Sequence, residues 1–155
     1  PLGHGLPVAV GMAKAAKLTG ATYHTYVLTG DGEMQEGSNW EAISSAAQFD
    51  LDNLTLIIDH NRFQQGAALK DTNNLAPFPS KLEAFGWEVT EINGNVMNEI
   101  VPALQHRGSR PHCIVAHTNK GHGISFMQDT VDWHHKVPNA EQYKIAVAEL
   151  SEVLA

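Results

Sequence analysis

The sequence has little cysteine and no long apolar run, and each shortage excludes a class of protein. Cys113 is the only cysteine and lies in a short apolar run, so no disulfide can form within the chain and a small buried hydrophobe is expected there. A reducing cytoplasm fits this usage best. No apolar stretch approaches the roughly 20 residues that a membrane-spanning helix needs, and the first residues do not resemble a signal peptide. We therefore expect no association with a membrane.

Positive charge is also scarce. The chain has 10 lysines and arginines against 17 aspartates and glutamates, for a formal charge of -7. No stripe of basic residues is present that would follow a phosphodiester backbone, so nucleic acid is not an expected partner. With 155 residues, 43% of them apolar, the chain can bury one core. We predict a single domain over 1–155. Because the chain opens at Pro1 without an initiator methionine, we expect that natural sequence preceding this point has been removed.

Apolar runs of strand length alternate with segments of helical periodicity. Helices are predicted over 6–18, 38–49, 80–85, 98–106 and from 140 onward, and strands over 25–29, 54–58, 88–92 and 112–117. This alternation predicts an α/β fold, a mostly parallel sheet flanked by helices on both faces. The last helix places Tyr143, Val147, Leu150 and Leu154 on one side, so we expect it to dock on the domain. Residues 70–79 are predicted to form a surface loop.

Polar residues follow two of the predicted strands. Gly30, Asp31 and Gly32 end the first strand, and Asn61 follows the next after 28 intervening residues, 33–60. That spacing suits one strand-helix-strand unit, so both groups are expected at the carboxyl edge of adjacent parallel strands, where ligands bind. A carboxylate and an amide oxygen suit Mg²⁺, which takes few protein ligands and completes its shell with phosphate and water. Taken alone, Gly-Asp-Gly is also an ordinary turn sequence.

The surrounding sequence closely resembles transketolase. The matching words, in the family's order, are PLGHG at 1–5, GDGEMQEG at 30–37, WEA at 40–42, DHNRFQ at 59–64, AFGW at 84–87, TNKGHG at 118–123 and WH at 133–134. The resemblance covers essentially the whole chain. It implies a thiamine diphosphate-binding fold of the type that holds the cofactor's diphosphate, the PP domain.

The resemblance also implies roles for individual residues. The implied Mg²⁺ ligands are Asp31, the Asn61 side chain and the backbone carbonyl of Phe63. The residues expected to bind the cofactor are Gly30, Gly32, Glu33, Asn61, Lys120 and His134, with His134 also catalytic. For Glu33 the other interpretation is favourable charge at a helix start, and for Lys120 it is a solvated side chain.

Several positions depart from the family pattern or keep two interpretations. His135 replaces the glycine that usually follows His134, and Arg62 replaces a second asparagine without touching the metal ligands. His4 stands where glutamine is usual in the family. We expect its side chain either to lie near the cofactor or to pack against neighbouring residues. Glu36 and Glu41 correspond to positions at the interface between subunits, and ordinary surface charge is their alternative. The remaining histidines lack the clustered spacing of a zinc site.

The implied reaction is transfer of a two-carbon ketol unit between a ketose phosphate and an aldose phosphate. In the family, the glutamate that activates the cofactor's aminopyrimidine belongs to a pyrimidine-binding domain, which this sequence lacks. We therefore expect one part of a homo- or hetero-oligomeric transketolase, either a truncated chain or one component of a split enzyme, that is inactive alone. The alternatives are a 1-deoxyxylulose-5-phosphate synthase-like enzyme, which the words at 35–37 and 40–42 disfavour, and a non-catalytic remnant that binds a protein partner.

Overall fold

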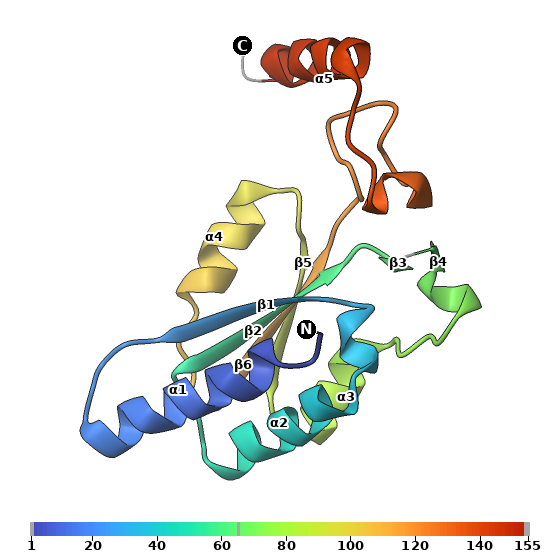
Figure 1. Ribbon diagram of the computed structural model, residues 1–155. Helices are drawn as coiled ribbons and strands as arrows, with labels where there is room; N and C mark the ends of the chain where they lie inside the picture. Colours follow the sequence, from blue (N-terminus) through green and yellow to red (C-terminus); the bar gives the residue numbers. More distant parts are fainter. Residues whose placement is uncertain (1, 65, 154–155) are drawn as a thin grey trace.

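A parallel four-stranded sheet forms the centre of the computed structural model, which describes residues 2–64 and 66–153 (Figure 1). The strands of this sheet, in spatial order, are β1 (Thr25–Gly30), β2 (Leu54–His60), β6 (His112–His117) and β5 (Glu88–Asn93). The helices are α1 (Gly5–Thr19), α2 (Gly37–Gln48), α3 (Phe78–Ala84), α4 (Met97–Gln105) and α5 (Ala140–Val153). Each neighbouring pair of strands in this sheet is parallel. The predicted α/β fold is confirmed.

Helices cover both faces of the sheet. This arrangement explains the continuous apolar run at 113–116 in β6. Cys113 and Val115 face the cluster formed with α1, α2 and α3, whereas Ile114 and Ala116 face the cluster formed with α4. Successive side chains of a strand point to opposite faces. A strand between two helical layers therefore needs apolar residues on both faces, as at 113–116 of β6. Burial raises the pKa of the Cys113 thiol, in agreement with the small buried hydrophobe expected there.

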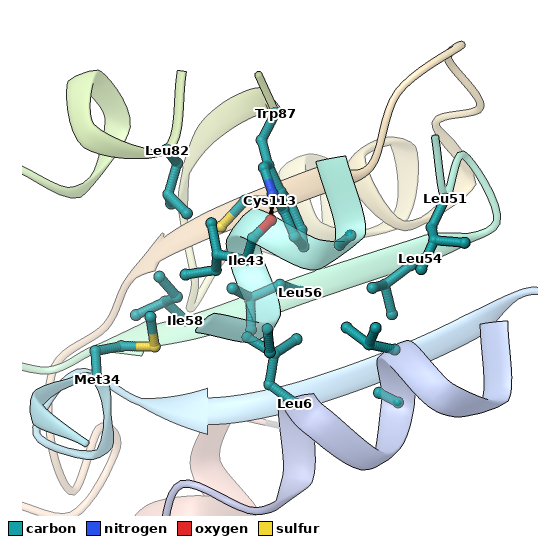
Figure 2. Packing of buried hydrophobic residues seen from close by; sticks show 14 of the residues in the cluster. Leu6, Met34, Ile43, Leu51, Leu54, Leu56, Ile58, Leu82, Trp87 and Cys113 are labelled. Carbon is teal, nitrogen blue, oxygen red and sulfur yellow. Dashed lines mark hydrogen bonds between the residues drawn. The ribbon is translucent and has the colours of Figure 1, made fainter. Parts of the chain in front are cut away.

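The larger cluster lies between the sheet and the first three helices (Figure 2). Leu56 and Ile58 of β2 are fully buried in it, together with Ile43 of α2. Trp87 is also buried, and its indole Nε1 donates a hydrogen bond to the Ile43 carbonyl at 3.0 Å. Because this bond satisfies the indole N–H, the ring can fill the core without an unpaired donor. The packing fixes α2 against the sheet, and α2 follows the first predicted ligand loop after one short 3-10 turn.

The opposite face of β1 is open. Its Leu28 is 67% exposed and Tyr26 is 42% exposed, and β1 is an edge strand of the sheet. The Tyr26 hydroxyl donates to the Leu104 carbonyl of α4 at 2.8 Å and accepts from the Arg107 guanidinium at 2.7 Å. These polar contacts tie α4 to β1 only at its carboxyl end, so the apolar side chain of Leu28 stays uncovered.

The terminal helix departs from its prediction. In α5, Tyr143 is 62% exposed, and Val147 and Leu150 are also exposed, while Leu154 lies outside the described residues. In Figure 1, α5 lies apart from the sheet. The Glu149 carboxylate instead accepts hydrogen bonds from Ser125 in the preceding loop, at 2.8 Å for the backbone N–H. The expectation that this helix docks on the domain is wrong, because periodicity defines an apolar side but not the surface that it contacts.

The segment between β2 and α3 also differs in detail from the predicted loop. It contains the short strands β3 (Phe63–Gln64) and β4 (Ala67–Ala68) and the 3-10 turn η2 (Leu69–Asp71). An irregular stretch then leads to α3, which begins at Phe78 with Pro79 in its first turn. Proline is tolerated there because the first N–H groups of a helix have no intrahelical partner. The loop therefore ends at residue 77, two residues before the predicted end at residue 79.

Within the described part of the chain, no helix combines the length and the apolar character needed to cross a bilayer.

We predict that His112 makes the domain acid-sensitive. Its imidazole is 3% exposed and shares a 2.9 Å hydrogen bond with the Thr90 hydroxyl. Burial lowers the pKa of His112 from 6.5 to about 4, so below pH 6.5 the unfolded chain binds more protons than the folded one. The contribution of neutral His112 to the free energy of unfolding is fully present above pH 6.5 and is lost as the pH falls toward 4. At pH 5 this loss is about 2 kcal/mol.

Urea unfolding of wild type and His112→Gln at pH 7.5 and pH 5 measures this effect. The variant should lose less stability than wild type between the two pH values, whatever its absolute stability. His122→Gln is the matched control, since His122 is exposed. An equal loss in wild type and His112→Gln would refute the role of His112.

Candidate functional site

The register of β1 and β2 brings the two predicted ligand loops together. Gly30 pairs with Asp59 in the parallel ladder, and the Asp31 N–H donates to the Asp59 carbonyl at 3.1 Å. The segments that follow β1 and β2 therefore both leave the sheet at its carboxyl edge, as the spacing predicted. A cleft of about 640 Å³ opens at this edge. Its lining residues are Leu2, Gly30, Asp31, Gly32, Glu33, Gln35, Glu36, Asn61, Phe63, Gln64, Gly66, Ala67, Thr72 and His134.

Asp31 is a buried carboxylate beside this cleft. Its side chain is 0% exposed, with Oδ2 accepting the Arg62 N–H at 2.6 Å and Oδ1 accepting the Gly32 N–H at 2.8 Å. Burial raises the pKa of Asp31, although these two hydrogen bonds oppose the shift. Among the described residues it forms no ion pair with a basic side chain. A buried negative charge without a counter-ion is costly, and a bound cation would compensate it.

Asn61 lies on the other wall, after β2. Its Oδ1 accepts the Phe63 N–H at 2.9 Å, which shapes the turn that carries both predicted ligands. Arg62 between them has φ of 70°, a left-handed conformation that is uncommon outside glycine. This conformation accompanies the contact of the Arg62 N–H with Asp31. The two loops are thus joined directly, through backbone and side chain.

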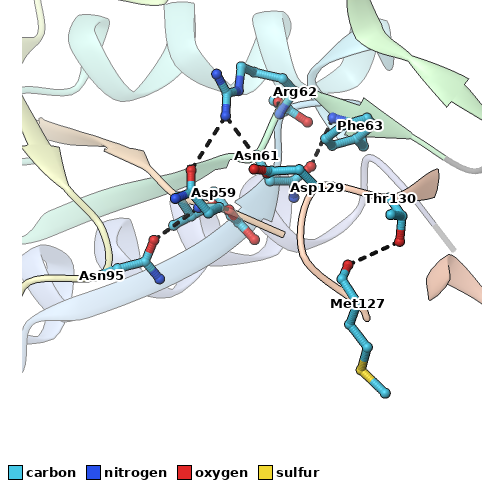
Figure 3. A network of polar contacts seen from close by, with 11 residues as sticks. Asp59, Asn61, Arg62, Phe63, Asn95, Met127, Asp129 and Thr130 are labelled. Carbon is cyan, nitrogen blue, oxygen red and sulfur yellow. Dashed lines mark hydrogen bonds and ion pairs between the residues drawn. The ribbon is translucent and has the colours of Figure 1, made fainter. Parts of the chain in front are cut away.

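The Arg62 side chain ties the same turn to the loop after β6 (Figure 3). Its guanidinium lies 3.5 Å from Asn119 Oδ1 and 3.9 Å from Asp129 Oδ1. The Asn119 N–H in turn donates to the Asn95 side chain, which follows β5. Segments that follow three neighbouring strands are therefore cross-linked at one edge. Because this network leads away from the cleft, it supports the shape of the site without lining it.

His134 reaches the cleft from a distant part of the sequence. It ends the 3-10 turn η3 (Val131–His134) and packs edge-on against the His135 ring, with centroids 4.6 Å apart. Partial desolvation lowers the pKa of His134, and the nearby charges of Lys120 and His135 act in the same direction. A neutral imidazole at the cleft can both donate and accept a hydrogen bond. The replacement of glycine by His135 therefore leaves His134 at the predicted site.

Not every predicted residue reaches the cleft. Lys120 is absent from its lining and acts on it only through its charge near His134. His4 is exposed at the start of α1 and neither lines the cleft nor packs in the core. Glu36 lies at the cleft, whereas Glu41 is exposed on α2. The interface roles of these two glutamates stay predictions.

Sequence reasoning missed the side that covers the cleft. Gln64 packs over Gly32 and donates from Nε2 to the Thr72 hydroxyl at 2.5 Å. Gln35 donates to the Asn73 carbonyl at 2.9 Å. These contacts hold the segment after β2 against the first ligand loop. The only available signal was the glutamine that follows Phe63, since neither β3 nor β4 is long enough to give a periodic pattern.

No group of three histidine, cysteine or acidic side chains within the described residues is placed to hold a metal ion. The donors near Asp31 are oxygens of one carboxylate and one amide. This set fits a hard cation that shares its shell with phosphate and water. It does not fit zinc, which would need a closed set of nitrogen or sulfur ligands.

Comparison with known proteins identifies the family of the chain. Residues 1–150 match the family model described as "Transketolase, thiamine diphosphate binding domain". The chain belongs to the transketolase family. Its fold is likewise that of the transketolases: the Campylobacter jejuni enzyme superposes with a TM-score of 0.93 at 32% identity, over 97% of this chain and 25% of that one. The family resemblance expected from the sequence is confirmed.

The transketolase relatives include subunits of divided enzymes. The chain is 49% identical over 153 residues to an apulose-4-phosphate transketolase subunit from Actinobacillus succinogenes, covering 97% of this chain and 55% of that protein. It is 37% identical over 154 residues to the "6-deoxy-6-sulfo-D-fructose transketolase subunit SqwG" of Clostridium sp. (strain MSTE9), covering 97% and 56%. The chain thus spans about half the length of these relatives.

We predict that only glycine fits at position 32, because Gln64 of β3 lies too close to leave room for a side chain. A Cβ added at Gly32 would lie 2.9 Å from Gln64 Cβ, whereas a Cβ added at Gly30 would meet nothing within 4 Å. Gly32→Ala should therefore displace the Gln64 segment and lower the free energy of unfolding by about 1–3 kcal/mol. Gly30→Ala is the matched control and should change it by less than about 1 kcal/mol. Urea unfolding and the backbone NMR shifts of 63–68 measure both effects; equal responses of the two variants would contradict the steric argument.

Proposed function

We propose that the cleft binds the diphosphate of thiamine diphosphate through Mg²⁺, and that the chain is one part of a transketolase. The observation that carries this proposal is Asp31, a fully buried carboxylate without a basic partner among the described residues. A single buried charge at the end of a parallel strand, beside an amide side chain, suits Mg²⁺ shared with a diphosphate.

The residues of the cleft fit that pair of ligands. Asp31, the Asn61 side chain and the Phe63 carbonyl are the proposed protein ligands of Mg²⁺. Gly30 and Gly32 carry no side chain that would keep a diphosphate from the backbone. Thiamine diphosphate, when bound, supplies the carbanion-stabilising group needed to move a ketol unit. The roles of this chain are to hold and orient it and to exclude water on one side.

His134 is the proposed catalytic residue. It lines the same cleft as Asp31, and its pKa is lowered by partial desolvation. A neutral imidazole can donate a hydrogen bond to an oxygen of the reacting sugar or accept a proton from it. Lys120, whose charge acts on His134, is proposed to add positive potential for the diphosphate rather than a direct contact.

We further propose that the substrates are a ketose phosphate and an aldose phosphate, and that a second domain or subunit completes the site. The names of both relatives contain the word "subunit", and one names a sugar phosphate. A pyrimidine-binding partner would supply the carboxylate that acts on the aminopyrimidine. The working enzyme is accordingly proposed to be a cytoplasmic oligomer, a dimer of complete units. A non-catalytic remnant is the alternative, and titration with thiamine diphosphate and Mg²⁺ tests it.

We predict that Asp31→Asn abolishes most metal-dependent binding without unfolding the domain. The variant keeps the shape of the side chain but removes the charge, so affinity for thiamine diphosphate with Mg²⁺ should fall roughly 10- to 100-fold. The amide NH₂ of asparagine replaces one of the two oxygens that accept the Gly32 and Arg62 N–H groups, so one hydrogen bond is lost and the ligand-free melting temperature should fall. Removal of the buried charge offsets part of that loss, so the domain should remain folded. Calorimetric titration measures the affinity, with the chain alone or joined to its partner.

Asp50→Asn is the matched control. Asp50 is exposed in a turn with φ of 47°, a conformation that asparagine also adopts. It should bind like wild type. Unchanged affinity in Asp31→Asn would overturn the metal assignment, and no binding by wild type with a partner domain present would favour the non-catalytic remnant.

We also predict that the chain alone has no transketolase activity and that activity returns when a pyrimidine-binding domain is supplied in trans or by fusion. The held diphosphate is one end of the cofactor, and a group that moves its proton must lie within hydrogen-bond reach of the other end. The assay contains thiamine diphosphate, Mg²⁺, a ketose phosphate donor and an aldose phosphate acceptor. Robust turnover by the isolated monomer would sink the proposal of an incomplete site.

A further inference from the structure

The segment that opens the chain is fastened to the turn after β1 by two side chains. The Gly3 N–H donates to Glu33 Oε1 at 3.0 Å, and the Ser38 hydroxyl donates to the Gly3 carbonyl at 2.7 Å. Glu33 belongs to the 3-10 turn η1 (Glu33–Gln35) and Ser38 to the first turn of α2. Both backbone polar groups of one residue are therefore satisfied from a segment 30 or more positions away. We call this arrangement the Gly3 clasp.

The Gly3 clasp leaves no room for a side chain. Gly3 is buried with φ of 74°, and a Cβ added there would lie 2.6 Å from Glu36 Cβ and 2.7 Å from Ser38 Oγ. Positive φ and this close approach both require glycine. The contact therefore accepts only glycine at this position. Removing one of the two hydrogen bonds of Gly3 should make the Gly3 segment less firmly held.

The residue before Gly3 forms part of the cleft wall. Leu2 lines the cleft together with Glu33 and Gly32. It adds an aliphatic surface to a cleft that contains the carboxylates of Glu33 and Glu36 as well as the apolar side chain of Phe63. Since Leu2 is covalently bound to Gly3, whatever fixes the Gly3 peptide also fixes the position of Leu2.

The charge of Glu33 needs an explanation in a site for a diphosphate. A carboxylate repels phosphate oxygens and cannot donate a hydrogen bond to them. Its hydrogen bond to Gly3 gives the carboxylate a different task. The Gly3 N–H also lies two residues before α1, where negative charge is favourable near the amino end of a helix. These features favour an indirect role for Glu33 over a direct cofactor contact.

We propose that Glu33 is a positioning residue that acts through Gly3 and sets Leu2 in the wall of the cofactor cleft. This inference rests on the proposed function for its consequence in binding, but the clasp itself is testable without any ligand.

The first measurement compares amide hydrogen exchange of Gly3 by NMR in the 155-residue chain. Glu33→Ala should lose about tenfold in protection, because one charged hydrogen bond is removed. Glu33→Gln retains an acceptor oxygen and should keep most of the protection. Glu83→Ala is the charge-loss control, since Glu83 is exposed on α3 and outside the cleft. Unchanged protection in Glu33→Ala would overturn the proposal.

The second measurement is calorimetric titration with thiamine diphosphate and Mg²⁺, with the partner domain present. Glu33→Ala should weaken affinity roughly fivefold to tenfold, while Glu33→Gln should bind as well as wild type or better, since repulsion is removed. Equal weakening by both variants would show that the charge itself matters and would refute positioning. Loss of Gly3 protection in Glu33→Ala, with no binding by any protein including wild type, would support the clasp and count against the proposed function instead.

Discussion

The register of β1 against β2 is the constraint on which the site depends. With Gly30 opposite Asp59, the chain after each strand leaves the sheet at the same level, and Asp31 reaches the Arg62 N–H across the gap. A slip of one residue would turn every side chain of β1 to the other face, and would remove Thr25 and Val27 from the α1 side of the sheet. The buried apolar side chains of β2 resist such a slip, so the geometry of the polar edge is maintained by the packing of the apolar centre.

At that edge, the buried charge of Asp31 lowers the stability of the ligand-free domain and is also the feature proposed to bind a cation. Asp31 is held by two N–H groups but, among the described residues, has no basic partner, which leaves the ligand-free domain with an uncompensated buried charge. Such a charge weakens the folded state. The same carboxylate is the proposed ligand of a cation, which would compensate that charge. The cross-links through Arg62 and Asn119 hold together the loops that follow β2, β6 and β5.

Much of this could be predicted from the sequence, and the failures share a cause. Short runs rich in β-branched and apolar residues located all four strands of the main sheet, and strand-to-strand spacing placed Asp31 near Asn61, because both depend on local patterns. Three features depend on long-range contacts instead. Neither the position of Gln64 over Gly32 nor the undocked α5 follows from periodicity, and the partner of Glu33 is Gly3, 30 residues away. Lys120 was expected at the cleft from its neighbours in the sequence, but the loop after β6 directs it elsewhere.

The open face of β1 has a consequence for how the chain behaves in solution. An edge strand with an exposed Leu28 and Tyr26 can act as a template for pairing between chains. Such a surface favours self-association as concentration rises, and charge repulsion from the net charge of -7 opposes it. High salt, which screens that repulsion, therefore moves the balance toward aggregates. The tendency of the isolated chain to associate should therefore depend on ionic strength, independently of its folding stability.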